Sequence, residues 1–235
     1  GNCVVLKPSP GAPATAAVLS EIVGECFPKE LVALVPHAPQ AVEELLTQRF
    51  DHIFYTGGGT FGREIMARAA ERLTPVTLEL GGKSPCVVGA EADLKLAARR
   101  IVWGKTLNAG QTCVAPDYLL IDGRVKDQFL SHVKKWMTAM YEQDPLDNQG
   151  YVRMINRKHY DRVMGLIDPA KVVYGGRGDP DTLKIQPTIL DGVSPEDPVM
   201  QEEIFGPLLP VLTYDTLDRA VEFINSRPHP LALYL

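Results

Sequence analysis

Residues 52–73 read HIFYTGGGTFGREIMARAAERL. The stretch begins with an apolar run from His52 to Tyr55, as in a buried strand, and ends in Thr60 to Leu73, where apolar residues recur at helical spacing. Between them lies the run Gly57-Gly58-Gly59-Thr60-Phe61-Gly62, which fits the G-x-G-x-x-G pattern of dinucleotide-binding loops. Glycines at such a turn let the backbone approach a pyrophosphate at the positive end of a helix. The stretch therefore predicts a nucleotide-binding α/β unit.

The same alternation of strand and helix continues on both sides of this stretch. In the first 80 residues we expect strands at 4–6, 31–35, 52–55 and 76–80 and helices at 14–26, 40–48 and 60–73. Strands separated by helices of this length predict a parallel sheet with helices on both faces. Residues 1–80 are therefore interpreted as part of a Rossmann-like, parallel-sheet lobe that binds a nucleotide.

After Gly82 the alternation continues more loosely, which favours a second α/β lobe over residues 81–235. Its expected strands are 85–88, 118–121, 186–190, 208–214 and 231–235, its helices 94–107, 125–141, 156–167 and 217–225, with a loop at 142–152 and a hairpin near 175–180. The overall fold class predicted is α/β in two lobes, truncated at both ends. The chain begins without Met and begins and ends inside strand-like runs, so we expect an internal fragment of a longer protein.

Composition excludes several classes of function. The net charge is −5 and no basic block offsets it, which argues against a nucleic-acid partner. No apolar run approaches the roughly 20 residues of a membrane helix, and no secretory signal is visible. The four cysteines form no C-x-x-C pair and have no His-rich neighbours, so we expect no metal site and no disulfide framework. A reducing, cytoplasmic location is the resulting expectation.

Two residues carry the candidate chemistry, Glu79 in LELGGKSP (78–85) and Cys113 in NAGQTCVAP (108–116). A thiol whose surroundings favour the thiolate is a nucleophile, and a carboxylate held close to an acyl carbon can activate water. Glu79 also lies about 20 residues after the glycine loop, where a dinucleotide fold places its ribose ligand, so spacing leaves both roles open. A P-loop ending in Gly82-Lys83-Ser84 is excluded because Thr77 stands where its first glycine must be.

Four runs then occur in a fixed order: FYTG (54–57), LELGGKSP (78–85), GQTC (110–113) and EEIFGP (202–207). In these runs the chain resembles the aldehyde dehydrogenase superfamily, and the similarity spans essentially all 235 residues. Residues 73–79 and 113–118 look most like the class 3 branch, which acts on fatty and aromatic aldehydes. The resemblance implies oxidation of a small-molecule aldehyde to a carboxylic acid with NAD or NADP, and a homodimer when the protein is full length.

The resemblance also implies a role for each matching residue. The Cys113 thiol would attack the aldehyde carbon to give a thiohemiacetal and then a thioester, and its backbone N–H would donate to the oxyanion. Glu79 would activate water to hydrolyse the thioester. Cofactor binding would fall to Lys7, Thr56, Gly57, Gly58, Gly62, Leu80, Glu203 and Phe205. Of these, Lys7 would bind the adenosine ribose and Glu203 the nicotinamide ribose. Asn108 is interpreted as structural, and Cys3, Cys26 and Cys86 as inert.

Two departures and two alternatives remain open at this point. Pro10 stands where the family usually has a Glu that selects the ribose diol of NAD, which leaves the choice between NAD and NADP open. Gly58 and Gly59 replace the Ser or Asn of many relatives. An acylating relative would pass the acyl group to coenzyme A or phosphate, a reading that Glu79 disfavours. A non-catalytic nucleotide-binding relative is disfavoured by the presence of both Cys113 and Glu79.

Overall fold

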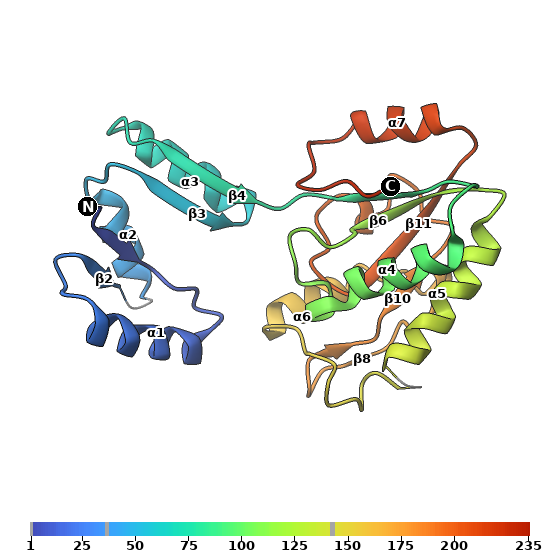
Figure 1. Ribbon diagram of the computed structural model, residues 1–235, viewed down its shortest axis with the longest axis horizontal. Coiled ribbons are helices and arrows are strands. Elements are labelled where there is room, and N and C mark those ends of the chain that lie inside the picture. Colours follow the sequence, from blue (N-terminus) through green and yellow to red (C-terminus); the bar gives the residue numbers. More distant parts are fainter. Residues whose placement is uncertain (1, 36–37, 142–143) are drawn as a thin grey trace. The chain divides into compact units, whose positions relative to one another are not determined.

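The computed structural model describes residues 2–35, 38–141 and 144–235, and the chain divides into two compact units, Gly1–Glu79 and Leu80–Leu235 (Figure 1). Two residues of the loop expected at 142–152, Glu142 and Gln143, lie outside the described residues. The expected α/β class is confirmed, because helices and strands alternate in both units. No helix in the described ranges combines the length and the apolar character that crossing a membrane requires.

The first unit holds four strands and three helices. They are β1 (Val4–Leu6), α1 (Pro13–Cys26), β2 (Val32–Leu34), α2 (Pro39–Thr47), β3 (Ile53–Gly57), α3 (Gly59–Ala70) and β4 (Val76–Leu80), whose last residue falls in the second unit. The strands pair as β1 with β2, in parallel, and β3 with β4. Two separate pairs therefore replace the single sheet expected for this part of the chain. Because each pair has few partners, all three β1 side chains are exposed.

The second unit is built on a five-stranded sheet in the order β5-β6-β11-β10-β7. Its strands are β5 (Pro85–Val88), β6 (Tyr118–Asp122), β7 (Val172–Tyr174), β10 (Thr188–Leu190) and β11 (Leu208–Tyr214). Four strands run parallel, and the edge strand β7 is antiparallel to β10. Near-continuous apolar runs such as Tyr118–Asp122, buried at every position, suit a sheet that is covered on both faces.

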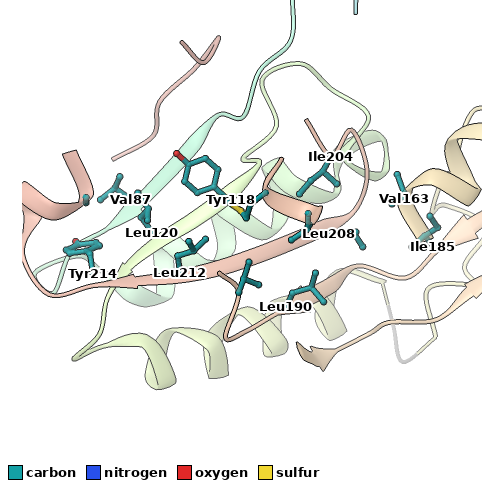
Figure 2. Close-up of a cluster of buried hydrophobic side chains, with 14 of the residues drawn as sticks. Val87, Tyr118, Leu120, Val163, Ile185, Leu190, Ile204, Leu208, Leu212 and Tyr214 are labelled. Atoms are coloured by element: carbon teal, nitrogen blue, oxygen red, sulfur yellow. The ribbon is translucent and has the colours of Figure 1, made fainter. Parts of the chain in front are cut away.

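Alternate residues of these strands enter two different cores. Leu119, Ile121 and Val211 face α4 (Leu94–Thr106) and α5 (Lys126–Tyr141), which lie side by side (Figure 1). Leu120 and Leu212 face the opposite way, where α6 (Arg157–Met164) and α7 (Leu217–Asn225) contribute Val163 and Ala220 (Figure 2). Because successive side chains of a strand point to opposite faces, the apolar residues of these strands form a core on each face of the sheet.

Several element boundaries differ from the expectation by one to three residues or more. Helix α6 ends at Met164 instead of Ile167. The hairpin pairs β8 (Gly178–Asp179) with β9 (Lys184–Ile185), so its turn follows the residues expected to form it. The expected last strand is reduced to one isolated bridge between Tyr234 and Cys86 on the free edge of β5. The Tyr234 hydroxyl nevertheless donates to the carbonyl oxygen of Val114, the residue that follows Cys113.

Candidate functional site

The turn that carries Cys113 is built from a run of left-handed residues. Helix α4 passes into a short 3-10 turn (Leu107–Gly110), in which Asn108, Ala109 and Gly110 have φ of 52°, 52° and 73°. Left-handed φ costs about 1–2 kcal/mol for each residue other than glycine. Such strain persists only where tertiary contacts hold it, and it is typical of functional turns. The turn reverses the chain so that Cys113 lies half-buried between α4 and β6.

The side chain of Gln111 holds this turn. Its Nε2 donates to the carbonyl oxygens of Asn108 (3.0 Å) and Arg153 (3.1 Å), and its Oε1 accepts from the Ile155 N–H (2.9 Å). In return, Asn108 Nδ2 donates to the Gln111 carbonyl at 3.0 Å. The expected structural role of Asn108 fits this pattern. Gln111 thus ties the Cys113 turn to the segment that precedes α6, a role that its place in the GQTC run did not predict.

The loop that carries Glu203 packs directly on the Cys113 turn. A Cβ on Gly110 would lie 2.2 Å from the Gly206 carbonyl oxygen, so the two backbones touch. Phe205, the residue before Gly206, also has a left-handed φ, 47°. Two strained loops, both taken from runs that were read as motifs, therefore meet in the second unit. The contact is between backbone atoms, and only a glycine at position 110 leaves room for it.

The Glu203 carboxylate lies over the glycine pair that follows β4. A Cβ on Gly81 would fall 1.9 Å from Glu203 Oε2, so this approach also requires glycine. Burial raises the pKa of the Glu203 carboxyl, while the Gly82 N–H and the positive charges of Lys105 and Arg162 act against that shift. Among the described residues, Glu203 Oε1 is the one buried side-chain oxygen or nitrogen without a hydrogen-bond partner. A buried acceptor left open in this way is a ready ligand for a hydroxyl donor.

A buried ion pair between Lys83 and Asp117 contacts the loop that carries Glu203. Lys83 Nζ bonds Asp117 Oδ2 and also donates to the carbonyl oxygens of Val199 (2.8 Å) and Glu202 (2.9 Å). The Lys83 and Asp117 side chains are 11% and 4% exposed, and burial lowers the pKa of Lys83. Because a buried charge costs several kcal/mol unless it is well paired, the three bonds to Lys83 account for its place there.

Lys105 is the second buried lysine of this region. It is 1% exposed, and burial lowers its pKa to about 8, against the opposing influence of Asp117 and Glu203. Sequence reasoning missed it, although a signal was present. Lys105 continues the buried stripe Ala98, Ile101 and Val102 of α4 at helical spacing, so a charged residue occupied a core position of the pattern.

The remaining sequence-predicted residues belong to the first unit or to its border. Lys7 follows β1, and its ammonium donates to the Pro8 carbonyl at 3.1 Å. Thr56 and Gly57 end β3, Gly58 caps α3 with φ −71°, and Gly62 is buried one turn into that helix. Glu79 is the exposed residue of β4, and Leu80 ends the strand. Of the other cysteines, Cys3 and Cys26 are exposed, and burial raises the pKa of Cys86 to about 12.

The described residues hold no cluster of three or more His, Cys, Asp or Glu side chains that could bind a metal ion. The second unit instead holds a half-buried thiol on a strained turn and, on the loop that packs against this turn, a carboxylate with one buried oxygen that lacks a hydrogen-bond partner. A family model described as the aldehyde dehydrogenase family matches residues 1–235. The chain belongs to the aldehyde dehydrogenase family. The four ordered runs FYTG, LELGGKSP, GQTC and EEIFGP are therefore motifs of that family in this chain.

Individual family members agree with this placement. The chain is 48% identical, over its whole length and 52% of the relative's, to the mouse "Aldehyde dehydrogenase, dimeric NADP-preferring". It is 43% identical to the Pongo abelii "Aldehyde dehydrogenase family 3 member A2", over its whole length and 48% of the relative's. These relatives are of the class 3 type expected from residues 73–79 and 113–118. The chain spans about half the length of the curated relatives that it matches.

Solved structures of the family have the same fold. The structure titled "Substrate bound state of Staphylococcus Aureus AldH" superposes with a TM-score of 0.97 and 42% identity, over all of this chain and 52% of that one. An indole-3-acetaldehyde dehydrogenase in complex with NAD+ gives a TM-score of 0.89 and 33% identity, over 99% of this chain and 50% of that one.

Proposed function

We propose that the full-length protein oxidises an aldehyde to a carboxylic acid with NAD+ or NADP+. Family membership supports the reaction class, and relatives named as NADP-preferring or solved with NAD+ support the cofactor. The observation that carries the proposal in this chain is the open Glu203 Oε1, buried against Gly81 and packed, through its loop, on the Cys113 turn. The proposed ribose ligand and the proposed nucleophile therefore belong to two loops of the second unit that pack on each other.

The described residues fit a dinucleotide. The buried, unpartnered oxygen of Glu203 suits a ribose hydroxyl, and Lys7, directly after β1, offers an ammonium donor that suits the hydroxyls of the other ribose. Gly58 has open space where a side chain would stand, and a Cβ on Gly59 would meet the end of the Arg63 side chain at 3.7 Å. Both glycines lie at the amino end of α3, which has no side-chain cap and suits a pyrophosphate. Gly57 and Gly62 complete this loop, and Thr56, Leu80 and Phe205 are the residues that we propose to contact the nicotinamide. Bound NAD(P)+ supplies the acceptor for the hydride.

The chain's own residues carry the covalent steps. The Cys113 thiolate adds to the aldehyde carbon, and its backbone N–H donates to the oxyanion that forms. Loss of one such donor typically lowers the rate by about 10²–10³-fold. No hydrogen bond from this N–H is found among residues 2–35, 38–141 and 144–235. After oxidation to the thioester, Glu79 takes a proton from water as the water adds to the acyl carbon, and the acid leaves as the thiol is restored.

Two substitutions in the full-length protein test these roles. Cys113→Ser removes the nucleophile and is expected to abolish steady NAD(P)H production, whereas the exposed Cys26→Ser serves as its matched control and keeps full activity. Glu79→Gln leaves the first covalent steps intact, so a burst of NAD(P)H followed by slow turnover is expected. Steady turnover by Cys113→Ser would refute the nucleophile assignment. Weakened cofactor binding by Glu79→Gln without a burst would instead assign Glu79 to the ribose.

The choice of cofactor and of acyl acceptor needs one further assay. NAD and NADP are compared over a panel of fatty and aromatic aldehydes, with and without coenzyme A. Hydrolysis to the free acid is expected in every case, because Glu79 is present, and acyl-coenzyme A as the main product would favour the acylating alternative. We also propose that the full-length protein is a homodimer, in line with the name of the mouse relative. Sedimentation of the same preparation measures this directly.

A further inference from the structure

The backbone on both sides of Glu203 is held by one ion pair. The carbonyl of Glu202, the residue before it, accepts from Lys83 Nζ at 2.9 Å. The N–H of Ile204, the residue after it, donates to Asp117 Oδ1 at 2.9 Å. Lys83 and Asp117 bond each other through Asp117 Oδ2. The two halves of the pair therefore bracket Glu203, and neither touches its carboxylate through a recorded hydrogen bond.

Further contacts of the pair extend its hold on this loop. Lys83 Nζ also donates to the carbonyl oxygen of Val199 at 2.8 Å, in the short 3-10 turn Pro198–Met200 that precedes the Glu203 loop. Arg162 of α6 also contacts this loop and donates to the carbonyl oxygens of Glu203 (3.3 Å) and Ile204. Arg162 also pairs with the exposed Glu202 carboxylate at 2.8 Å. The backbone from 199 to 204 is thus held by three charged side chains from distant parts of the sequence.

The pair also joins the motifs to each other. Lys83 lies four residues after Glu79 in LELGGKSP, and Asp117 lies four residues after Cys113. The Asp117 N–H in turn donates to the Ser84 carbonyl at 2.8 Å, so the two segments run together at the start of β5 and β6. One buried ion pair therefore contacts the segment that follows the proposed base, the segment that follows the proposed nucleophile and the Glu203 loop.

We propose that Lys83 and Asp117 are positioning residues that set the conformation of the Glu203 loop and, through it, the affinity for the nucleotide. The pair acts through backbone hydrogen bonds on both sides of Glu203 and does not contact the ligand. Removal of either partner releases the Glu202 carbonyl or the Ile204 N–H and lets the carboxylate leave Gly81. The part of the proposal that concerns affinity rests on the proposed cofactor site, whereas the part that concerns the loop does not.

The first experiment measures the loop without any cofactor. Amide hydrogen exchange is followed in the full-length protein carrying Lys83→Met, Asp117→Asn or both. Because hydrogen bonds to charged groups contribute about 1.5–3 kcal/mol, exchange at residues 199–206 is expected to rise at least about tenfold. Lys126→Met is the matched control, since it breaks another partly buried ion pair of the same unit, to Asp191 at 2.9 Å. Unchanged exchange at 199–206 in both single variants overturns the proposal.

The second experiment measures the dissociation constants of NAD and NADP by equilibrium titration. Each single variant is expected to bind about tenfold more weakly. The double variant, which leaves no unpaired buried charge, is expected to bind no more weakly than the singles, because the pair acts as one unit. The rate at which iodoacetamide alkylates Cys113 without cofactor stays within about twofold of the parent, whereas general unfolding would raise it. The proposal is overturned if the loss of nucleotide affinity is matched by a proportional rise in the rate of Cys113 alkylation. It is also overturned if all three variants bind the nucleotide as tightly as the parent.

The two experiments separate this proposal from the proposed function. If the parent protein binds neither NAD nor NADP, the proposed function fails, and the exchange measurement still decides whether the pair holds the loop. If the parent binds a dinucleotide and the variants bind it equally well, the positioning role fails while the proposed function stands.

Discussion

The glycine loop of the first unit and the Cys113 turn of the second are both glycine-bearing turns at the end of a helix, and they are built in opposite ways. Gly58 has an ordinary φ of −71°, and a Cβ added there meets nothing within 4 Å. Gly110 has a φ of 73°, and a Cβ added there meets the Gly206 carbonyl at 2.2 Å. Position 58 therefore has no steric need for glycine in the fold of its own loop, whereas the Cys113 turn cannot form without glycine at position 110.

The difference shows two separate reasons for a glycine in a motif. At Gly58 the space is open, and the role that we propose for this glycine is to let a ligand approach the backbone. At Gly110 the space is taken by another part of the same chain, so glycine serves the fold. A motif read from sequence cannot distinguish the two, because both appear as a glycine between regular elements. Four substitutions test the distinction, from the largest expected effect to the smallest.

Gly110→Ala should have the largest effect. The new methyl would meet the Gly206 backbone in a left-handed conformation, so a loss of about 4 kcal/mol in the free energy of unfolding is expected. Urea denaturation of the full-length protein measures it, with Gly123→Ala, whose Cβ meets nothing within 4 Å, as the control. If Gly110→Ala costs no more than its control, the close approach to Gly206 does not exist in solution and the comparison collapses.

Lys105→Met should stabilise the protein near neutral pH. Lys105 leads into the Cys113 turn, and burial lowers its pKa to about 8 from an ordinary value of 10.5. At pH 7 the parent therefore buries a charge at a cost of about 3 kcal/mol, which methionine removes. Between pH 8 and 10.5 the unfolded parent binds the extra proton, so the stability of the parent rises with pH across that window. The gain from Lys105→Met should shrink to nothing over the same window.

A set of unfolding curves at several pH values checks the Lys105 prediction. The difference between the variant and the parent is the quantity to follow, because Cys86 and Tyr118, whose pKa values burial raises to about 12, contribute with the opposite sign above pH 9 in both proteins. A constant gain from pH 7 to 10.5 would show that Lys105 does not titrate in the folded state as described.

Gln111→Ala should mainly disturb the Cys113 turn. The substitution removes two hydrogen bonds that tie the turn to Arg153 and Ile155 and one within the turn, to Asn108. We therefore expect kcat to fall about tenfold to a hundredfold while the KM for the nucleotide stays near that of the parent. Gln48→Ala is the matched control, because its amide also donates to a backbone carbonyl, of Glu44 at 3.2 Å, in the first unit. An equal loss of kcat in both variants would remove Gln111 from the positioning of the thiol.

Gly58→Ala should have the smallest effect on the fold. An alanine at this helix cap costs about 0.5–1 kcal/mol, because φ is ordinary and the space is open, and only the weaker capping by alanine counts. The affinity for NAD and NADP is the sensitive quantity, since the new methyl would stand where the pyrophosphate is proposed to approach. Equilibrium titration and thermal unfolding of the same sample measure both. A large loss of stability with unchanged affinity would reverse the roles assigned to the two loops.

Much of the fold was predictable because the sequence patterns are local. The period of two in the strands and the helical spacing of α4 and α5 gave their positions to within a few residues. The predictions failed where the formation of a sheet depends on which other strands are available to pair. The four strands of the first unit form two pairs instead of one sheet, and the last strand is a single bridge at Tyr234, because the number of hydrogen-bonding neighbours is not written in the strand itself.

The candidate site divides in the same way. Cys113, Glu79 and Glu203 were named from motifs, whereas Lys83, Asp117 and Gln111 acquire their roles only from contacts that link residues 34 to 119 positions apart. Lys105 was visible as a charge in an apolar stripe and was not singled out. Side chains that act through another residue leave no local pattern, because their partners are distant in sequence.

By itself, the amino-acid sequence determined the family and the α/β class and proposed the nucleophile, since these depend on short ordered runs and on hydrophobic periodicity. The tertiary structure alone decided that the Cys113 turn is left-handed, that Gly206 packs on it, and that one buried ion pair holds both sides of Glu203. The physical reason is that strain and buried charge are stable only where several distant groups compensate them at once. Such compensation exists in the folded chain and in no segment of it.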